Sequence, residues 1–220
     1  MSAQSLEPQE PLIVDILHEI TDLVTGARVD RYGKARAATV DPRLNLRLNL
    51  GRTRAIRYAT GIYHQAPAPP YYDSVRGADR LAPMRAIHHV VGYETGREAE
   101  GFYLRAEGYA KQYSDLPLED GESGYTSEGY GWSKAIDLFS QWRTSRLDIR
   151  AMASWLQARR RWTPSEQRGR YALPDGTWRP DFEIPWSAQL VAIVPLGNGV
   201  AIAGSWRSAA GRLHTPIVGS

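Results

Sequence analysis

The chain has 220 residues, of which 42% are hydrophobic, and a formal net charge of +3. It contains no cysteine, which excludes disulfides, thiol catalysis and zinc–thiolate sites. No apolar run approaches the roughly 18 residues that a transmembrane helix requires. The positive charge is spread along the chain, and its one basic run, Arg159-Arg160-Arg161, is interpreted as the solvated base of a loop. Because nucleic-acid binding requires a clustered basic face, we expect no nucleic-acid partner.

Residues 1–21 differ from the rest of the chain and are predicted to form a separate segment before residues 22–220. Leu12, Ile16 and Ile20 recur at helical spacing, which is consistent with a short amphipathic helix, a degraded strand or a frayed terminus. The segment has no basic beginning, and Asp15 and Glu19 interrupt its apolar residues. It is therefore not expected to act as a secretory signal.

From residue 23 onwards, apolar and polar side chains alternate in about nine successive segments, which predicts an all-β protein. The clearest segment carries Leu44, Leu46, Leu48 and Leu50 on one face, with arginines and asparagines on the other. A helix would spread these leucines around its circumference. The predicted strands are Leu23–Arg31, Ala38–Leu50, Arg54–His64, Met84–Thr95, Gly101–Tyr113, Trp132–Trp142, Leu147–Ala158, Ser187–Leu196 and Val200–Arg207.

Short and long connections alternate along the chain. The short turns lie at Leu50–Thr53, Gly96–Ala99, Arg143–Arg146 and Leu196–Gly199, and the predicted long connections lie at Ala66–Pro83, Leu116–Tyr130 and Arg160–Pro185. An antiparallel up-and-down meander through an outer membrane has this arrangement, with tight turns facing the periplasm and long loops facing outwards. The pattern therefore predicts part of a transmembrane β-barrel.

Two groups of residues are candidates for ligand contact. The polar faces of the strands would line the barrel lumen, where their charges pair across strands or contact a ligand. Aromatic rings and arginines in the long connections would contact a ligand outside the barrel by stacking, hydrogen bonding and charge. The lumen candidates are Arg28, Asp30, Arg43, Arg47, Arg105, Glu107, Lys111, Asp137 and Arg150. The loop candidates are Tyr71, Tyr72, Tyr125, Tyr130, Trp162, Arg168, Arg170 and Trp178.

No catalytic motif of the hydrolase, zinc-protease or P-loop type occurs in the sequence. The acidic group around Glu119 and Glu122 lies in a glycine-rich connection and is interpreted as solvated. His88 and His89 are adjacent on a strand and point to opposite faces, so they cannot share one metal ion. We therefore expect no enzymatic activity, no cofactor and no metal site.

Several segments, in their order and spacing, resemble the barrel strands of TonB-dependent outer-membrane receptors. The resemblance covers roughly residues 22–220, and no single motif is diagnostic. Its segments are Gly26–Tyr32, Asp41–Leu44, Ala59–Pro67, Leu104–Pro117, Gly129–Phe139, Asp181–Val191 and Trp206–Val218.

The resemblance implies a barrel, plugged by an amino-terminal domain, that imports scarce ligands such as iron chelates, cobalamin or glycans with energy relayed by TonB. We find no TonB-box-like segment and no plug domain, and the chain ends in Gly219-Ser220 where the family usually ends in an aromatic residue. The expectation is a fragment of a parent receptor located in the outer membrane. Its partners would be membrane lipid, the missing strands and plug, TonB only through that plug, and an unidentified small molecule.

Two other interpretations stay open at this point. One is a soluble all-β binding module whose long loops form a recognition face. The other is a small independent barrel, closed by an extra strand from Pro11–Thr21 or by self-association.

Overall fold

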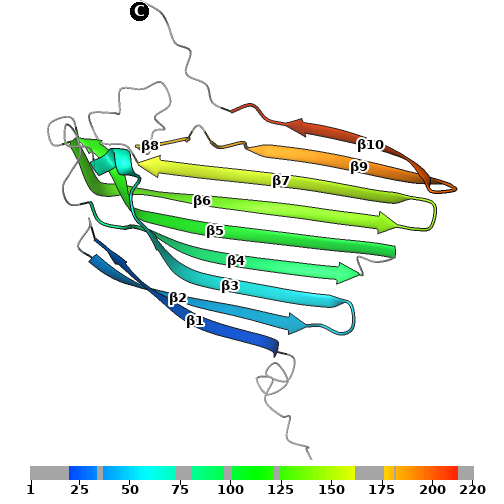
Figure 1. Ribbon diagram of the computed structural model, residues 1–220, viewed down its shortest axis with the longest axis horizontal. Helices are drawn as coiled ribbons and strands as arrows, with labels where there is room; N and C mark the ends of the chain where they lie inside the picture. Colours follow the sequence, from blue (N-terminus) through cyan, green and yellow to red (C-terminus); the bar gives the residue numbers. More distant parts are fainter. Residues whose placement is uncertain are drawn as a thin grey trace, which may run out of the picture.

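The computed structural model describes residues 20–33, 37–72, 81–96, 101–120, 124–161, 176–180 and 182–212. These residues form one antiparallel sheet of ten strands (Figure 1), with each strand beside its neighbour in the chain. The strand order is β1 to β7, then β9 and β10, and the short β8 pairs with β7 outside this path. The predicted all-β meander is thus confirmed. The strands are β1 Ile20–Tyr32, β2 Ala37–Asn49, β3 Arg54–Gln65, β4 Met84–Gly96, β5 Gly101–Asp120, β6 Gly124–Arg143, β7 Asp148–Arg161, β8 Thr177–Trp178, β9 Trp186–Gly197 and β10 Val200–Ala209.

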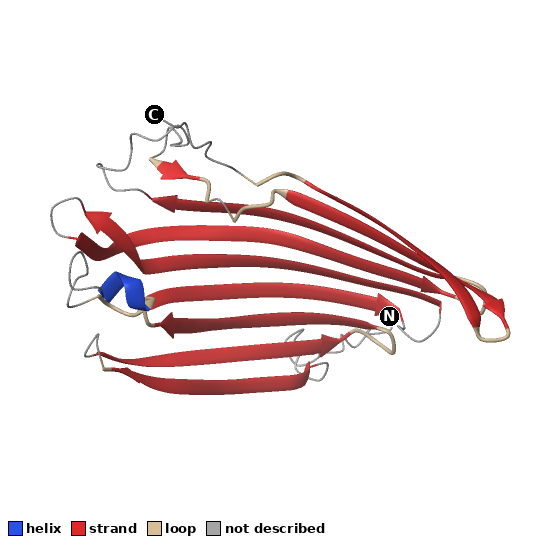
Figure 2. Ribbon diagram, turned by 45° about the horizontal axis from the view of Figure 1, so that its top comes forward, coloured by secondary structure: helices blue, strands red, loops and turns tan. Residues whose placement is uncertain are grey.

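The prediction of a long connection at Leu116–Tyr130 is wrong, because β5 and β6 continue as a paired hairpin through most of it. Pairing extends from Leu116 opposite Gly129 to Asp120 opposite Gly124. Asp115 has a φ of 57°, and the register shifts on both sides of Leu116. Such bulges bend a strand and tolerate proline within it. Figure 2 shows this extension bending at one end of the sheet, close to the 3-10 helix η1 (Pro69–Tyr72).

The pairing register divides the side chains into two faces, because directly opposed residues point to the same side. Leu44, Leu46 and Leu48 of β2 lie opposite Thr60, Tyr58 and Ile56 of β3. The same face carries mainly Val, Ile, Leu, Trp, Ala and Gly through to β10. We call it the apolar face. The other, polar face carries most charged residues of the strands.

The apolar face is uncovered, so the described chain has no sealed hydrophobic core. The described chain has few buried apolar side chains, and half of them are alanines such as Ala55 and Ala135, whereas many large apolar side chains are exposed. Trp142 of β6 is 52% exposed and Trp155 of β7 is 45% exposed. A continuous apolar surface of this kind is unfavourable in water and requires a partner or a membrane.

Two tryptophans mark the height of the apolar face on β6. Trp142 and Trp132 share this face and are ten residues apart. At about 3.3 Å per residue and a strand tilt of about 40°, they are separated by about 25 Å along the barrel axis. This is the height of the apolar band that aromatic girdles border in membrane barrels.

The sheet is open within the described residues, where β1 and β10 form its two edges and do not pair with each other. The predicted closing strand Pro11–Thr21 lies outside the described residues except for Ile20 and Thr21, which belong to β1. The proposed helix in residues 1–21 likewise lies outside them. Across the described parts of the chain, no helix has the length and apolar character needed to cross a bilayer.

Two neighbouring residues of β7 provide a test of the two faces. Ala153 lies opposite Leu138 on the apolar face, whereas Ser154 lies opposite Asp137 on the polar face. In detergent micelles we expect Ala153→Arg to lower the free energy of unfolding by about 2–4 kcal/mol, because the guanidinium meets hydrocarbon near mid-height. Ser154→Arg should change it by less than about 1 kcal/mol, because its charge faces a carboxylate. Denaturant titration that finds the reverse order contradicts the assignment of faces.

Candidate ligand-binding site

The pairing register places the nine lumen candidates on one face of the sheet. Arg28 lies opposite Asp41, Glu107 lies opposite Asp137, and Gln141 lies opposite Arg150, each pair on the polar side. Some of the nine are engaged in ion pairs near the short turns, and others line hollows nearer the long-loop end. The contacts of each group decide whether it is free to bind a ligand.

A carboxylate that the sequence analysis did not select, Glu94, holds two arginines on the polar face. Arg47 Nη2 donates to Glu94 Oε1 at 2.7 Å, and Arg57 Nη2 donates to the same oxygen at 3.1 Å. Glu94 lies two residues before the Gly96 turn, and its position in the alternation of β4 is the signal that could have identified it. Arg47 is therefore a member of a structural ion pair.

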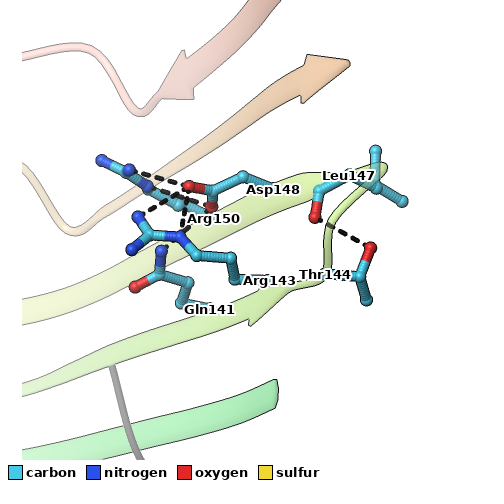
Figure 3. Close-up of polar contacts among 6 residues, drawn as sticks. All are labelled: Gln141, Arg143, Thr144, Leu147, Asp148 and Arg150. Atoms are coloured by element: carbon cyan, nitrogen blue, oxygen red, sulfur yellow. Dashed lines mark hydrogen bonds and ion pairs between the residues drawn. The ribbon is translucent and has the colours of Figure 1, made fainter. Parts of the chain in front are cut away.

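Asp148 is a second such centre (Figure 3), at the start of β7. Arg143 Nη2 and Arg150 Nη2 both donate to its Oδ2, at 2.7 Å and 2.9 Å. Gln141 Nε2 donates to Oδ1 at 3.0 Å. These charge-assisted bonds join two strands just above the turn that Thr144 closes, so Arg150 also has a structural role.

A hollow of about 490 Å³ lies on the polar face between these clusters and the long-loop end. Three of the lumen candidates, Arg105, Glu107 and Asp137, line it. Ser154 Oγ donates to Asp137 Oδ1 in a very short hydrogen bond. Lys111 lies on the same face but nearer the long-loop end, with Nζ 4.7 Å from the centre of the Tyr109 ring.

A larger hollow of about 640 Å³ opens towards the long-loop end, and Arg28 and Arg43 line it. Its wall includes Asp41, which is only 2% exposed and accepts hydrogen bonds from the His64 backbone N–H at 3.1 Å and from its Nδ1 at 2.6 Å. The Arg43 guanidinium lies 4.7 Å from the centre of the Tyr63 ring. Asp30 does not line this hollow, and its Oδ2 lies 2.7 Å from Arg28 Nε.

Four of the aromatic loop candidates meet in one further hollow, of about 290 Å³, at the long-loop end. Tyr71 of η1 contacts Tyr125 edge-to-face at 5.0 Å between ring centres. The Arg161 guanidinium lies 5.2 Å from the centre of the Tyr130 ring, and Trp178 completes the aromatic lining. Tyr125, Tyr130 and Trp178 lie in strands β6 and β8, which corrects their placement in loops.

The remaining loop candidates cannot be placed in this hollow. The side chain of Tyr72 and all of Trp162, Arg168 and Arg170 lie outside the described residues.

Arg160 joins the two hollows, since it and Leu116 line both. The run Arg159–Arg161 is predicted from the sequence to be a solvated loop base. The structure corrects this, because each arginine has a different environment. Arg159 is paired and has a side chain only 14% exposed, Arg160 lines both hollows, and Arg161 lies against Tyr130 at the smaller hollow only.

Glu183 anchors the segment that leads into β9, where the ladder between β7 and β9 stops at Trp155 opposite Trp186. Its buried carboxylate accepts a hydrogen bond from the backbone N–H of Ala158 at 2.7 Å. Arg159 Nη1 lies 3.1 Å from Oε2, and Arg179 Nε donates to Oε1 at 2.8 Å. The side chain thus replaces the backbone acceptor that β9 no longer provides.

The described residues contain no cluster of three or more histidine, aspartate or glutamate side chains suited to a metal ion. The His88 ring lies 4.5 Å from the Tyr63 ring, centre to centre, at a tilt of 30° on the polar face, and His89 Nδ1 lies 3.0 Å from Tyr58 Oη on the apolar face. The two imidazoles point apart, as the alternation predicts.

No protein-family model matches the sequence, and no curated protein matches it. Solved structures with the same fold do exist. The iron transporter FrpB of Neisseria meningitidis superposes with a TM-score of 0.65 at 18% identity, covering 86% of this chain and 31% of that one. The ferric-catecholate import receptor Fiu of Escherichia coli K12 gives 0.61 at 11% identity, covering 79% and 26%. The siderophore receptor PiuA of Acinetobacter baumannii gives 0.59 at 9% identity, with 79% and 26% covered.

These proteins are TonB-dependent receptors, so the described sheet has the fold of a segment of their outer-membrane barrels. The chain spans between 26% and 31% of the length of these three receptors. The fold predicted from the sequence is therefore confirmed.

Removing the Glu183 carboxylate should unlock the segment before β9. We expect the Ala158 amide to exchange with solvent at least about tenfold faster in Glu183→Ala, because an unpaired buried N–H costs about 1–3 kcal/mol. Hydrogen exchange measured by NMR in micelles reports on this amide directly. Glu128→Ala, which removes an exposed carboxylate of β6, is the matched control and should leave the rate unchanged. Equal rates in the wild type and Glu183→Ala contradict the anchoring role.

Asp148→Asn should lower the free energy of unfolding by about 1 kcal/mol, because it leaves two arginines side by side without their shared anion, although solvent partly screens them. Asp30→Asn serves as the comparison, since its partner Arg28 has a side chain 64% exposed. We expect no measurable change there. Equal effects of both substitutions on denaturation in micelles contradict a structural role for the Asp148 cluster.

Proposed function

We propose that this chain forms part of the barrel wall of a TonB-dependent outer-membrane receptor that takes up a scarce ligand. The observation that carries the proposal is the separation of one continuous sheet into an uncovered apolar face and a charged, hollowed face. A membrane barrel uses the first to contact lipid and the second to line its lumen. The fold shared with FrpB and Fiu supports the same assignment.

The soluble binding module is the weaker alternative. A water-soluble sheet of this size must cover one face with a second layer, and the described residues contain no such layer over Leu138, Trp142 or Leu190. A single open sheet also exposes two edges, which invite aggregation in water. The apolar band therefore favours outer-membrane lipid as its partner.

The rest of the receptor would complete the structure. In this proposal, the other strands of the barrel pair with β1 and β10, and a plug domain contacts the polar face and relays energy from TonB. The chain itself performs no chemistry. Its parent would be located in the outer membrane.

The two connected hollows at the long-loop end are the proposed entry site for ligand. Arg28, Arg43 and Arg160 line them together with the rings of Tyr63 and Tyr125. The buried carboxylate of Asp41 is hydrogen-bonded to His64. Guanidinium groups that line a hollow beside aromatic rings favour an anionic ligand with planar groups. Among iron chelates, cobalamin and glycans, this chemistry favours an anionic iron chelate.

Ligand binding in micelles tests this site. We expect the purified chain to bind a ferric tris-catecholate complex, and Arg160→Gln to weaken binding about tenfold or more, because a hydrogen bond to a charged group contributes about 1.5–3 kcal/mol. Arg146→Gln, in the turn at the opposite end, is the control for lost charge and should bind normally. Titration calorimetry that detects no saturable binding by the wild type, or equal losses in both variants, contradicts the assignment.

A further inference from the structure

The apolar face changes character near the long-loop end of β6 and β7. From Trp142 up to Ile136, the residues on this face of β6 are Trp142, Ser140, Leu138 and Ile136. The next two ladder steps bring Lys134 opposite Gln157 and Trp132 opposite Arg159. Cationic side chains therefore first occur on the apolar face next to Trp132, the tryptophan nearer the long-loop end.

The charged side chains on the apolar face are all positive in the regularly paired part of the described ladder. In the regularly paired part of the described ladder, every aspartate and glutamate lies on the polar face. The nearest carboxylate on the outer side of β6 is Glu128, which is exposed and lies two residues beyond Tyr130 by alternation. No described carboxylate forms an ion pair with Lys134 or Arg161. Their positive charges lack a protein counter-ion among the described residues.

Each of the two cations lies against an aromatic ring near the long-loop end of β6 and β7. Lys134 Nζ lies 5.3 Å from the centre of the Trp132 ring, so the side chain reaches along the strand from the hydrocarbon towards the interface. Arg159 of β7 lies opposite Trp132, with its guanidinium carbon 5.9 Å from the centre of the same ring, and it is paired with Glu183. Arg161, two residues beyond Arg159, lies 5.2 Å from the centre of the Tyr130 ring, and both side chains also border the hollow of about 290 Å³. The rings position both charges at the membrane surface.

We propose that Lys134 and Arg161, ordered by Trp132 and Tyr130, form an outward-facing docking site for the phosphate group of an anionic lipid. The cations complement the charge of such a lipid, because they have no protein counter-ion among the described residues and border an apolar band that contacts acyl chains. A lipid satisfies both surfaces at once, with its chains on Ile136 and Trp155 and its phosphate between the cations. This inference rests on the proposed membrane location of the sheet.

Native mass spectrometry of the full chain in a neutral detergent tests the site with phosphatidylglycerol, phosphatidylcholine and inorganic phosphate as probes. We expect saturable binding of phosphatidylglycerol. Each cation near an anionic lipid contributes about fivefold in affinity, so Lys134→Gln combined with Arg161→Gln should weaken binding about 30-fold.

Lys111→Gln is the matched control, because Lys111 lies opposite Ser133 on the polar face, one residue from the level of Lys134. It should retain wild-type affinity for phosphatidylglycerol. Each single variant is measured as well, so that a folding defect in the double variant does not decide the result.

Equal affinity for phosphatidylcholine, or equal losses in Lys111→Gln and the double variant, overturns the lipid site. Inorganic phosphate binding as tightly as phosphatidylglycerol also overturns it, because the site would then recognise the free anion. If the chain requires detergent but binds phosphatidylglycerol and phosphatidylcholine equally, the lipid site is contradicted and the proposed function is not. A chain that stays soluble and monomeric without detergent overturns both.

Discussion

The antiparallel ladder is the constraint on which the other features of this structure depend. Each interior strand pairs with a neighbour on both sides, so the backbone N–H and C=O groups of the paired residues are satisfied without water. The same ladder forces successive side chains to opposite sides, and opposed residues of neighbouring strands to the same side. A sequence that alternates apolar and polar residues therefore produces two chemically distinct faces across the whole width of the sheet.

The polar face uses its charges in two different ways. Near the short turns, Glu94 and Asp148 each collect arginines from neighbouring strands and hold the hairpins together. Towards the long loops, Arg43 and Arg160 line open hollows beside aromatic rings. In the proposed receptor, this distribution places Arg43 and Arg160 at the end where a ligand from outside would arrive. The rigid ion pairs at the other end position those strands.

Sequence reasoning predicted the features that follow from alternation alone. It placed Leu44 with Leu46 on one face, and Arg105 with Lys111 on the other, because a period of two needs no knowledge of neighbouring strands. It missed the β5–β6 extension, since the bulge around Leu116 breaks the alternation and glycines surround the turn. It also missed Glu183 as a partner of Arg159, because a contact between segments 24 residues apart depends on where β9 leaves the ladder.

Site-directed spin labelling along β6 is the most direct test of the central claim, and the absence of native cysteine allows one label per variant. Labels placed singly at positions 136 to 141 would be measured in lipid bilayers for collision with oxygen, which concentrates in hydrocarbon, and with a water-soluble nickel chelate. The account predicts that the oxygen collision rate alternates with a period of two residues, high at Ile136, Leu138 and Ser140 and low at the positions between them. A flat profile, or one with its maxima at positions 137, 139 and 141, would contradict it.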